Sequence, residues 1–212
     1  MSVLNRLAHS LGRRDEVPNQ DLARDLAAKK DKAGIREVAE NLWNKDKNIQ
    51  ADCIKVLYEI GHIDPNLIWH YIKDFAKLLK SKDNRLVWGA MTAIAEIARV
   101  DPKEFILYKD DIKSAMESGS VITKDNGVLA LARAASHQRD YAFLIFPDLL
   151  IYLSTCRPKD VPQYSEKILL AINASNKADF IKVLEKRMED LSGGGLARVK
   201  KVIKQATLIT EN

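Results

Sequence analysis

The chain has 212 residues, of which 46% are apolar, and 34 lysine and arginine residues stand against 29 aspartate and glutamate residues. This length corresponds to one or two domains, and this apolar content is sufficient to form a core. With only 9 glycines and 6 prolines, the composition excludes a globally disordered chain and a collagen-like or mucin-like fibre.

The net charge of +5 lies at the two ends of the chain. Residues 1–14 and residues 193–212 each carry a net charge of +3, so the 178 residues between them carry −1. A protein that binds a polyanion over its whole surface would carry a basic excess throughout. The charge pattern therefore argues against that class of protein for the body of the chain.

Residues 1–17 are predicted to form an amphipathic segment or tail that precedes a single repeat domain at residues 18–212. The apolar residues of this segment fall on one helical face, and they are Leu4, Leu7, Ala8 and Leu11. Such a segment can cap the domain, fray in solution, or dock onto an anionic membrane or another protein. We favour a cap or a tail because the apolar area is small.

The two cysteines and the hydropathy of the chain indicate its compartment. Cys53 and Cys156 follow no CxxC spacing, which favours reduced thiols in a cytoplasmic protein. No stretch reaches the roughly 20 apolar residues of a membrane span, and the first residues lack the pattern of a secretory signal. We therefore expect a cytoplasmic protein without a transmembrane segment, and a monomer.

Two segments of the chain share one helical pattern at an offset of 37 residues. A first pair of helices is expected to begin near Asp21 and Ala33. After it, the similar tetrapeptides 45–48 and 82–85 each begin a segment, and the two segments match residue by residue. Their apolar residues recur at helical spacing over 49–60 and 86–97. Each segment ends at an Asp-Pro pair, because the residue before proline avoids the helical region.

Further helices are expected between and after these two segments. The amphipathic stretches lie at 67–79, 146–153, 161–174, 177–191 and 196–208. The three glycines at 193–195 are predicted to form a flexible turn between the last two helices. The repeating unit is therefore a helix, a short polar turn and a second helix.

Two of these patterns resemble the HEAT and armadillo class of repeat proteins. The second-helix pattern is Asp83-x-Arg85-x-x-x-x-Ala90-x-x-Ala93-Ile94-x-x-Ile97, and the first-helix pattern is Phe146-Pro147-Asp148-Leu149-Leu150. The resemblance implies an all-α fold, an α-solenoid in which about five antiparallel helix pairs form a right-handed superhelix. It also implies that the second helices line the concave face. Because helix pairs in such arrays bury their faces only by stacking, the repeats share one continuous core.

The resemblance predicts a non-catalytic interaction module that binds a peptide or protein along the second-helix face. On that face Tyr58, Trp88, Met91 and Thr92 are candidate contacts, or they pack against a neighbouring second helix. Asp125 and Asn126 are further candidate contacts, because the repeat pattern breaks at these residues. Two structures are possible at this break: both residues lie inside a helix, or the helix begins at Asp125 after a loop at 119–124.

A proline-rich entry to the helix at 161–174 supplies two more candidates. Gln163 and Glu166 can present hydrogen-bonding groups to a ligand there, although a structural turn explains the prolines equally well.

Motifs for catalysis and for metal binding are missing. The four histidines form no metal-ligand pattern, the glycine triplet is followed by no Gly-Lys-Ser/Thr, and no nucleophile motif occurs. We therefore expect no enzyme, no cofactor and no metal.

The alternative is a nucleic-acid-binding protein related to HEAT-like alkylpurine DNA glycosylases. The chain has a suitable length and three tryptophans, Trp43, Trp69 and Trp88. Its candidate basic patch consists of Lys80, Lys82 and Arg85, but no continuous basic stripe accompanies it.

Overall fold

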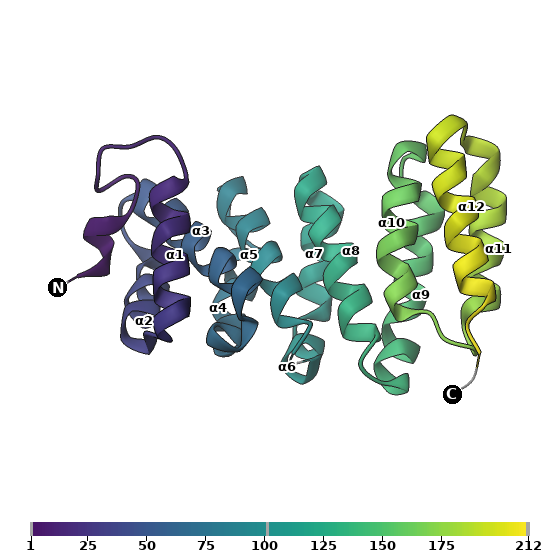
Figure 1. Ribbon diagram of the computed structural model, residues 1–212, viewed down its shortest axis with the longest axis horizontal. Coiled ribbons are helices and arrows are strands. Elements are labelled where there is room, and N and C mark those ends of the chain that lie inside the picture. Colours follow the sequence, from purple (N-terminus) through teal and green to yellow (C-terminus); the bar gives the residue numbers. More distant parts are fainter. Residues whose placement is uncertain (1, 101, 211–212) are drawn as a thin grey trace. The chain divides into compact units, whose positions relative to one another are not determined.

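The computed structural model describes residues 2–100 and 102–210, and within them it contains helices and no strand (Figure 1). Contacts divide the chain into two compact units, Met1–Gly127 and Val128–Asn212, with the boundary inside helix α8. The all-α prediction is confirmed. Within the described ranges, none of the helices combines the length and the apolar character that a membrane crossing requires.

The first unit consists of α-helices joined by short turns, several of which are 3-10 helices (η). Its elements are η1 (Val3–Arg6), α1 (Val17–Lys29), α2 (Lys32–Glu40), η2 (Asn41–Trp43), α3 (Lys47–Ile63), η3 (Pro65–Leu67), η4 (Trp69–Tyr71), α4 (Ile72–Leu78), α5 (Asn84–Ile97), α6 (Pro102–Leu107), α7 (Lys109–Ser118) and the start of α8 (Val121–Ala135).

The repeated tetrapeptides 45–48 and 82–85 form the N-terminal caps of α3 and α5. The Asp46 carboxylate accepts a hydrogen bond from the Asn48 backbone N–H at 2.8 Å, and Asp83 accepts one from Arg85 at 2.9 Å. Each aspartate satisfies a backbone donor that the first helical turn leaves without a partner. The sequence repeat is therefore a repeat of helix starts.

Helix α3 packs between α1 and α5, and it holds the centre of the core of this unit. Four of the apolar pairs matched by the offset of 37 are fully buried on both helices: Cys53, Val56, Leu57 and Ile60 on α3, and Ala90, Ala93, Ile94 and Ile97 on α5. Gly89 allows the close approach of the two helices, because a Cβ atom there would lie 2.7 Å from Cγ1 of Ile54. The helical pattern predicted for these two segments is confirmed.

The N-terminal segment is docked on this unit. Leu7 is fully buried, and the backbone N–H groups of Ala8 and His9 donate to Asn19 on α1 at 2.9 Å and to Asp52 on α3 at 2.7 Å. Among the described residues before α1, the helical element is η1, and it contacts α1 and α2. The division into an N-terminal segment at 1–17 and a repeat domain at 18–212 stays a prediction. In the structure, the segment contributes buried contacts to the first unit.

The second unit continues from the last part of α8 with four α-helices. Its elements are α9 (Arg139–Thr155), η5 (Pro158–Asp160), α10 (Val161–Ile168), η6 (Leu169–Ala171), α11 (Lys177–Arg187), η7 (Met188–Asp190) and α12 (Gly193–Thr207). Helices α9 and α10 both contact other helices of the unit, and α12 packs on α10 and α11. Fully buried residues include Leu149, Leu153, Phe180, Leu184 and Val199.

A buried arginine connects α11 to the end of α9. Arg187 is 7% exposed, and its guanidinium donates to the carbonyl oxygens of Leu153, Ser154 and Cys156, each at 2.8 Å. The last carbonyls of a helix have no partner within the helix. Arg187 therefore caps the C-terminus of α9 with a side chain from another helix.

Three sequence-based boundaries are corrected by the structure. Helix α9 begins at Arg139 instead of Phe146, and Pro147 lies inside it. The helix predicted over 67–79 is broken into η3, η4 and α4, and only 72–78 are α-helical. The glycines 193–195 form the first turn of α12 instead of a loop, with Gly193 at φ +53°.

The alternatives at the break in the repeat are also settled. Helix α8 begins at Val121, so Asp125 and Asn126 lie inside the helix and residues 121–124 are not a loop. Gly127 follows them because Met116 of α7 occupies the adjacent space, and a Cβ atom on Gly127 would lie 2.4 Å from Cγ and Sδ of Met116. The unusual residues at this break thus serve close helix packing.

Candidate functional site

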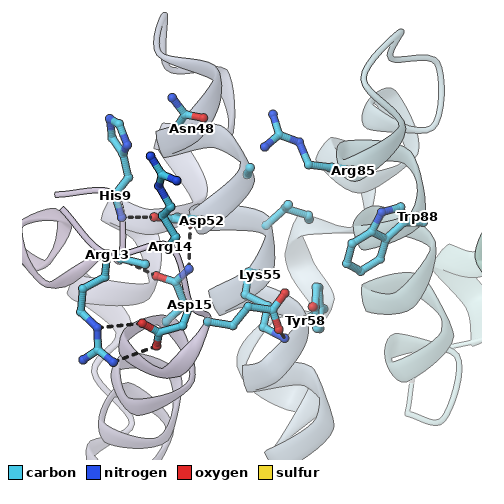
Figure 2. A pocket seen from close by; sticks show the side chains of 15 residues that line it. His9, Arg13, Arg14, Asp15, Asn48, Asp52, Lys55, Tyr58, Arg85 and Trp88 are labelled. Carbon is cyan, nitrogen blue, oxygen red and sulfur yellow. Dashed lines mark hydrogen bonds and ion pairs between the residues drawn. The ribbon is translucent and has the colours of Figure 1, made fainter. Parts of the chain in front are cut away.

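A cavity of about 460 Å³ lies in the first unit against α3 and α5 (Figure 2). The segment 8–19 lines one side of it, α3 lines the middle from Asn48 to Tyr58, and α5 contributes Arg85 and Trp88. Helices α3 and α5 are the two second helices that the repeat pattern identified. The cavity volume lies within the range of roughly 300–1,000 Å³ that is usual for ligand pockets.

An aromatic pair forms the wall of the cavity between α3 and α5. The ring centroids of Tyr58 and Trp88 are 5.6 Å apart, with the ring planes tilted by 53°. The Lys55 ammonium lies 4.8 Å from the Tyr58 ring centroid, within the range of a cation–π contact. Tyr58 is 6% exposed and Trp88 is half-buried. Trp88 is therefore the member of the pair that a ligand can contact over a larger surface.

The carboxylates of the cavity are occupied by donors of this chain. The Asp15 carboxylate accepts two hydrogen bonds from the Arg13 guanidinium, both at 2.9 Å, and this arginine holds the pKa of Asp15 below its usual value. The Asp52 carboxylate accepts hydrogen bonds from the His9 backbone at 2.7 Å and from the Asn19 amide at 2.8 Å. The charge of Asp15 is therefore balanced by Arg13, whereas Asp52, whose donors are uncharged amides, keeps its negative charge.

Lys55 is nearly buried and has two carboxylate partners. Its ammonium lies 2.7 Å from Glu16 and 2.7 Å from Glu59, and its side chain is 11% exposed. Burial by itself disfavours the charged form, but the two carboxylates outweigh it and raise the pKa of Lys55 above its ordinary value. Lys55 therefore stays charged and holds the start of α1 against α3.

Three polar side chains at the cavity retain unused donors. Among the described residues, neither the Arg14 guanidinium nor the Asn48 amide has a hydrogen-bond or ion-pair partner. Within the described part of the chain, Arg85 pairs with Asp83 of its own helix cap alone, at 3.2 Å, and Figure 2 shows it extending from α5 toward α3. The donors available to a ligand thus include two arginines and one amide, and they favour an anionic or carbonyl-bearing group.

The structure brings together two of the predicted partner contacts, Tyr58 and Trp88, and it removes two others from the surface. Met91 is fully buried, because its side of α5 faces the core, so it is corrected from a partner contact to a core residue. Thr92 is 7% exposed, and its hydroxyl donates to the Trp88 carbonyl at 2.8 Å and accepts from the Asn126 amide at 2.9 Å. The hydrogen bond between Thr92 and Asn126 joins α5 to α8.

The other predicted residues do not line this cavity. Asp125 is a half-buried residue of α8, and Gln163 is a half-buried residue in the first turn of α10. Glu166 is exposed and forms a bidentate ion pair with Arg198 of α12, at 2.8 and 2.6 Å. Gln163 and Glu166 belong to the second unit, and their roles as partner contacts stay predictions.

The predicted basic patch is partly neutralised by nearby carboxylates. Lys80 pairs with Asp111 at 2.9 Å and Arg85 pairs with Asp83, whereas Lys82 is exposed. Within the described ranges, histidine, cysteine and carboxylate side chains form no group of three or more that could hold a metal ion.

Sequence reasoning missed the contribution of the N-terminal segment to the cavity. His9, Arg13, Arg14 and Asp15 line it, although the sequence predicts residues 1–17 to be a cap or a tail. The arginines at 13 and 14 and the apolar face of the segment are visible in the sequence, but the docking position depends on hydrogen bonds to Asn19 and Asp52. No local pattern encodes these pairings.

Comparisons with known proteins identify the fold. No protein-family model matches the chain, and a search of the curated proteins also finds no match. Among solved structures, a designed armadillo repeat protein in complex with the peptide (KR)4 is similar with a TM-score of 0.70 and 16% identity, over 97% of this chain and 98% of that one.

Two further solved structures support the same assignment. A computationally designed armadillo repeat protein for modular peptide recognition is similar with a TM-score of 0.65 and 15% identity, over 91% of this chain and 94% of that one. An engineered protein of the Northeast Structural Genomics Consortium is similar with a TM-score of 0.68 and 18% identity, over 98% and 97%. The chain therefore has the all-α solenoid fold of armadillo-type repeat proteins, as the resemblance predicted.

Proposed function

We propose that the protein is a non-catalytic module that binds a peptide or a protein segment along the face formed by α3 and α5. The observation that carries this proposal is the cavity between these helices, with Trp88 half-buried in its wall and unused donors at its edge. Aromatic and arginine side chains are the residue types that most often dominate binding energy at protein interfaces. The similar designed proteins are described as binders of peptides.

The charge of the cavity favours a partner with acidic side chains. Asp15 and Glu16 are paired with Arg13 and Lys55, whereas among the described residues Arg14 has no partner and Arg85 pairs with Asp83 of its own helix cap. A peptide carboxylate placed near Arg14 or Arg85 gains charge-assisted hydrogen bonds. In this respect the proposed ligand differs from the basic peptide of the similar designed complex.

Selection of peptides from a random displayed library tests the proposal. We expect enrichment of extended peptides with aspartate or glutamate, and we expect the purified peptides to bind Trp88→Ala and Arg14→Ala at least about tenfold more weakly, which corresponds to about 1.4 kcal/mol. Trp43→Ala is the matched control, because Trp43 is also exposed, at 50%, and does not line the cavity.

Two results would contradict this proposal. One is a selected peptide that binds the Trp88→Ala and Arg14→Ala variants as tightly as the wild type. The other is salt-sensitive binding of single- or double-stranded DNA that is lost in Lys82→Ala, which would favour the nucleic-acid alternative.

A further inference from the structure

A second cavity of the first unit lies outside the proposed peptide site. It has a volume of about 330 Å³, it lies between α2 and the turns η3 and η4, and it shares no lining residue with the first cavity. Its volume is at the lower end of the range for pockets that hold small ligands. It is therefore large enough for a single ring system and its substituents.

The break in the predicted helix 67–79 creates this cavity. Three consecutive residues, Trp69, His70 and Tyr71, form the 3-10 turn η4, and α4 begins only afterwards. Their rings contact one another in sequence: the ring centroids of Trp69 and His70 are 5.8 Å apart in an edge-to-face arrangement, with the planes at 86°, and those of His70 and Tyr71 are 4.2 Å apart with the planes tilted by 44°. Trp69 is 39% exposed, which leaves much of its ring available to a ligand.

The deeper wall of the cavity is apolar. Ile35 of α2 and Leu67 of η3 line it, and they are 1% and 8% exposed. An apolar ring that enters between this wall and the aromatic rings of η4 is removed from water on both faces. The shape and chemistry of the cavity thus favour a flat aromatic group.

The charged residues of the cavity are all basic. Lys32 and Arg36 lie one turn apart on α2 and are exposed, and among the described residues neither forms an ion pair with a carboxylate. Of the residues that the structure describes, no aspartate or glutamate lines the cavity. Burial lowers the pKa of His70, and the charges of Lys32 and Arg36 lower it further. The cavity is therefore electropositive, which disfavours a cationic ligand.

We propose that this cavity binds an aromatic anion, with the ring against Trp69 and His70 and the anionic group between Lys32 and Arg36. Two cations one helical turn apart favour a doubly charged phosphate over a single carboxylate. The ligand class is accordingly an aryl phosphate, either free or as the phosphorylated tyrosine of a peptide. This site does not depend on the peptide cavity at α3 and α5.

Calorimetric titration with three small probes tests whether both parts of the ligand are needed. Phenyl phosphate carries the ring and the charge, inorganic phosphate carries the charge alone, and benzyl alcohol carries the ring alone. We expect phenyl phosphate to bind with a dissociation constant of about 1 mM or tighter. The other two probes should bind at least about tenfold more weakly, because each forfeits one set of contacts.

Variants assign the binding to this cavity. Arg36→Ala and Lys32→Gln should each lower the affinity for phenyl phosphate by about tenfold, and Trp69→Ala should lower it by several-fold. Lys45→Ala and Trp43→Ala are matched controls, because both residues are exposed and neither lines the cavity. Lys32→Gln should keep the far-UV circular dichroism spectrum and the unfolding midpoint of the wild type. A loss of binding in this variant is then caused by the changed side chain at the cavity and not by unfolding.

The outcome also identifies the source of the ligand. A short peptide with a phosphorylated tyrosine that binds more tightly than phenyl phosphate indicates a peptide partner, and equal affinity indicates a free small molecule. The proposal is overturned if inorganic phosphate binds as tightly as phenyl phosphate, if phenyl phosphate shows no saturable binding, or if Arg36→Ala and Lys32→Gln both retain wild-type affinity.

Discussion

The glycine at the break in the repeat offers the sharpest test of the packing. Gly127 lies inside α8, where alanine is the better helix former by about 1 kcal/mol. A Cβ atom there would lie 2.4 Å from two atoms of Met116, and this methionine is fully buried. Because non-bonded carbon atoms rest at about 3.5–4.0 Å, Gly127→Ala forces the methionine or the helix to move.

The expected magnitude follows from these two opposing terms. Overpacking of a core costs about 1–3 kcal/mol, whereas the gain in helix propensity is at most about 1 kcal/mol. We therefore expect Gly127→Ala to lower the free energy of unfolding by about 1–2 kcal/mol. The matched control is Gly194→Ala in α12, where a Cβ atom meets no other atom within 4 Å, and we expect it to raise the stability by about 0.5 kcal/mol.

Urea unfolding followed by far-UV circular dichroism measures both effects. A double-mutant cycle with Met116→Ala identifies the cause, since the steric penalty at Gly127 should disappear when the methionine side chain is removed. We expect a coupling energy of about 1 kcal/mol or more between the two sites. Stabilisation by Gly127→Ala in the wild-type background, or additive effects in the cycle, would refute the packing explanation.

Three other predictions follow from single contacts. Arg187→Met should lower stability by about 2–4 kcal/mol, measured by urea unfolding, because three carbonyls at the end of α9 lose their donor. Asn126→Ala should lower the free energy of unfolding by about 1 kcal/mol in the same measurement, because its amide donates a hydrogen bond to Thr92. The affinity for peptides that bind at α3 and α5 should not change. Burial raises the pKa of Cys53 from 9.0 to about 12, so the stability contributed by its neutral thiol is present below pH 9 and is lost as the pH rises toward 12. Between pH 8 and pH 10 the wild type should therefore lose about 1.4 kcal/mol more than Cys53→Ala.

The regular part of the fold could be predicted because its causes are local. Asp46 and Asp83 each cap a helix through a contact two residues away, and the apolar periodicity of the following residues fixes the buried side of α3 and α5. The repeat spacing therefore determines both the start and the orientation of these helices. The same reasoning identified the face on which Tyr58 and Trp88 lie.

The irregular part could not be predicted because its causes are distant contacts. The amphipathic spacing of 67–79 fits one helix, but the structure forms two 3-10 turns before α4. Pro147 was assigned to a helix start, where proline is usual, yet α9 continues through it. Likewise Met91 shares a helical face with Trp88 in projection, and only the packing of the core shows that it is fully buried.

The net charge of the chain proves to be a poor guide to its ligands, because it counts charges that already have partners. The body of the chain carries −1, yet in the first cavity Asp15 is paired with Arg13 and Glu16 with Lys55, while Arg14 is not paired with any described residue. In the second cavity Lys32 and Arg36 face aromatic rings with no carboxylate among the lining residues. Because opposite charges in contact cancel at a distance, only unpaired charges attract a ligand. Both cavities should therefore select anions, and affinity at each should fall as the salt concentration rises, whereas binding driven by the apolar walls alone would not respond in this way.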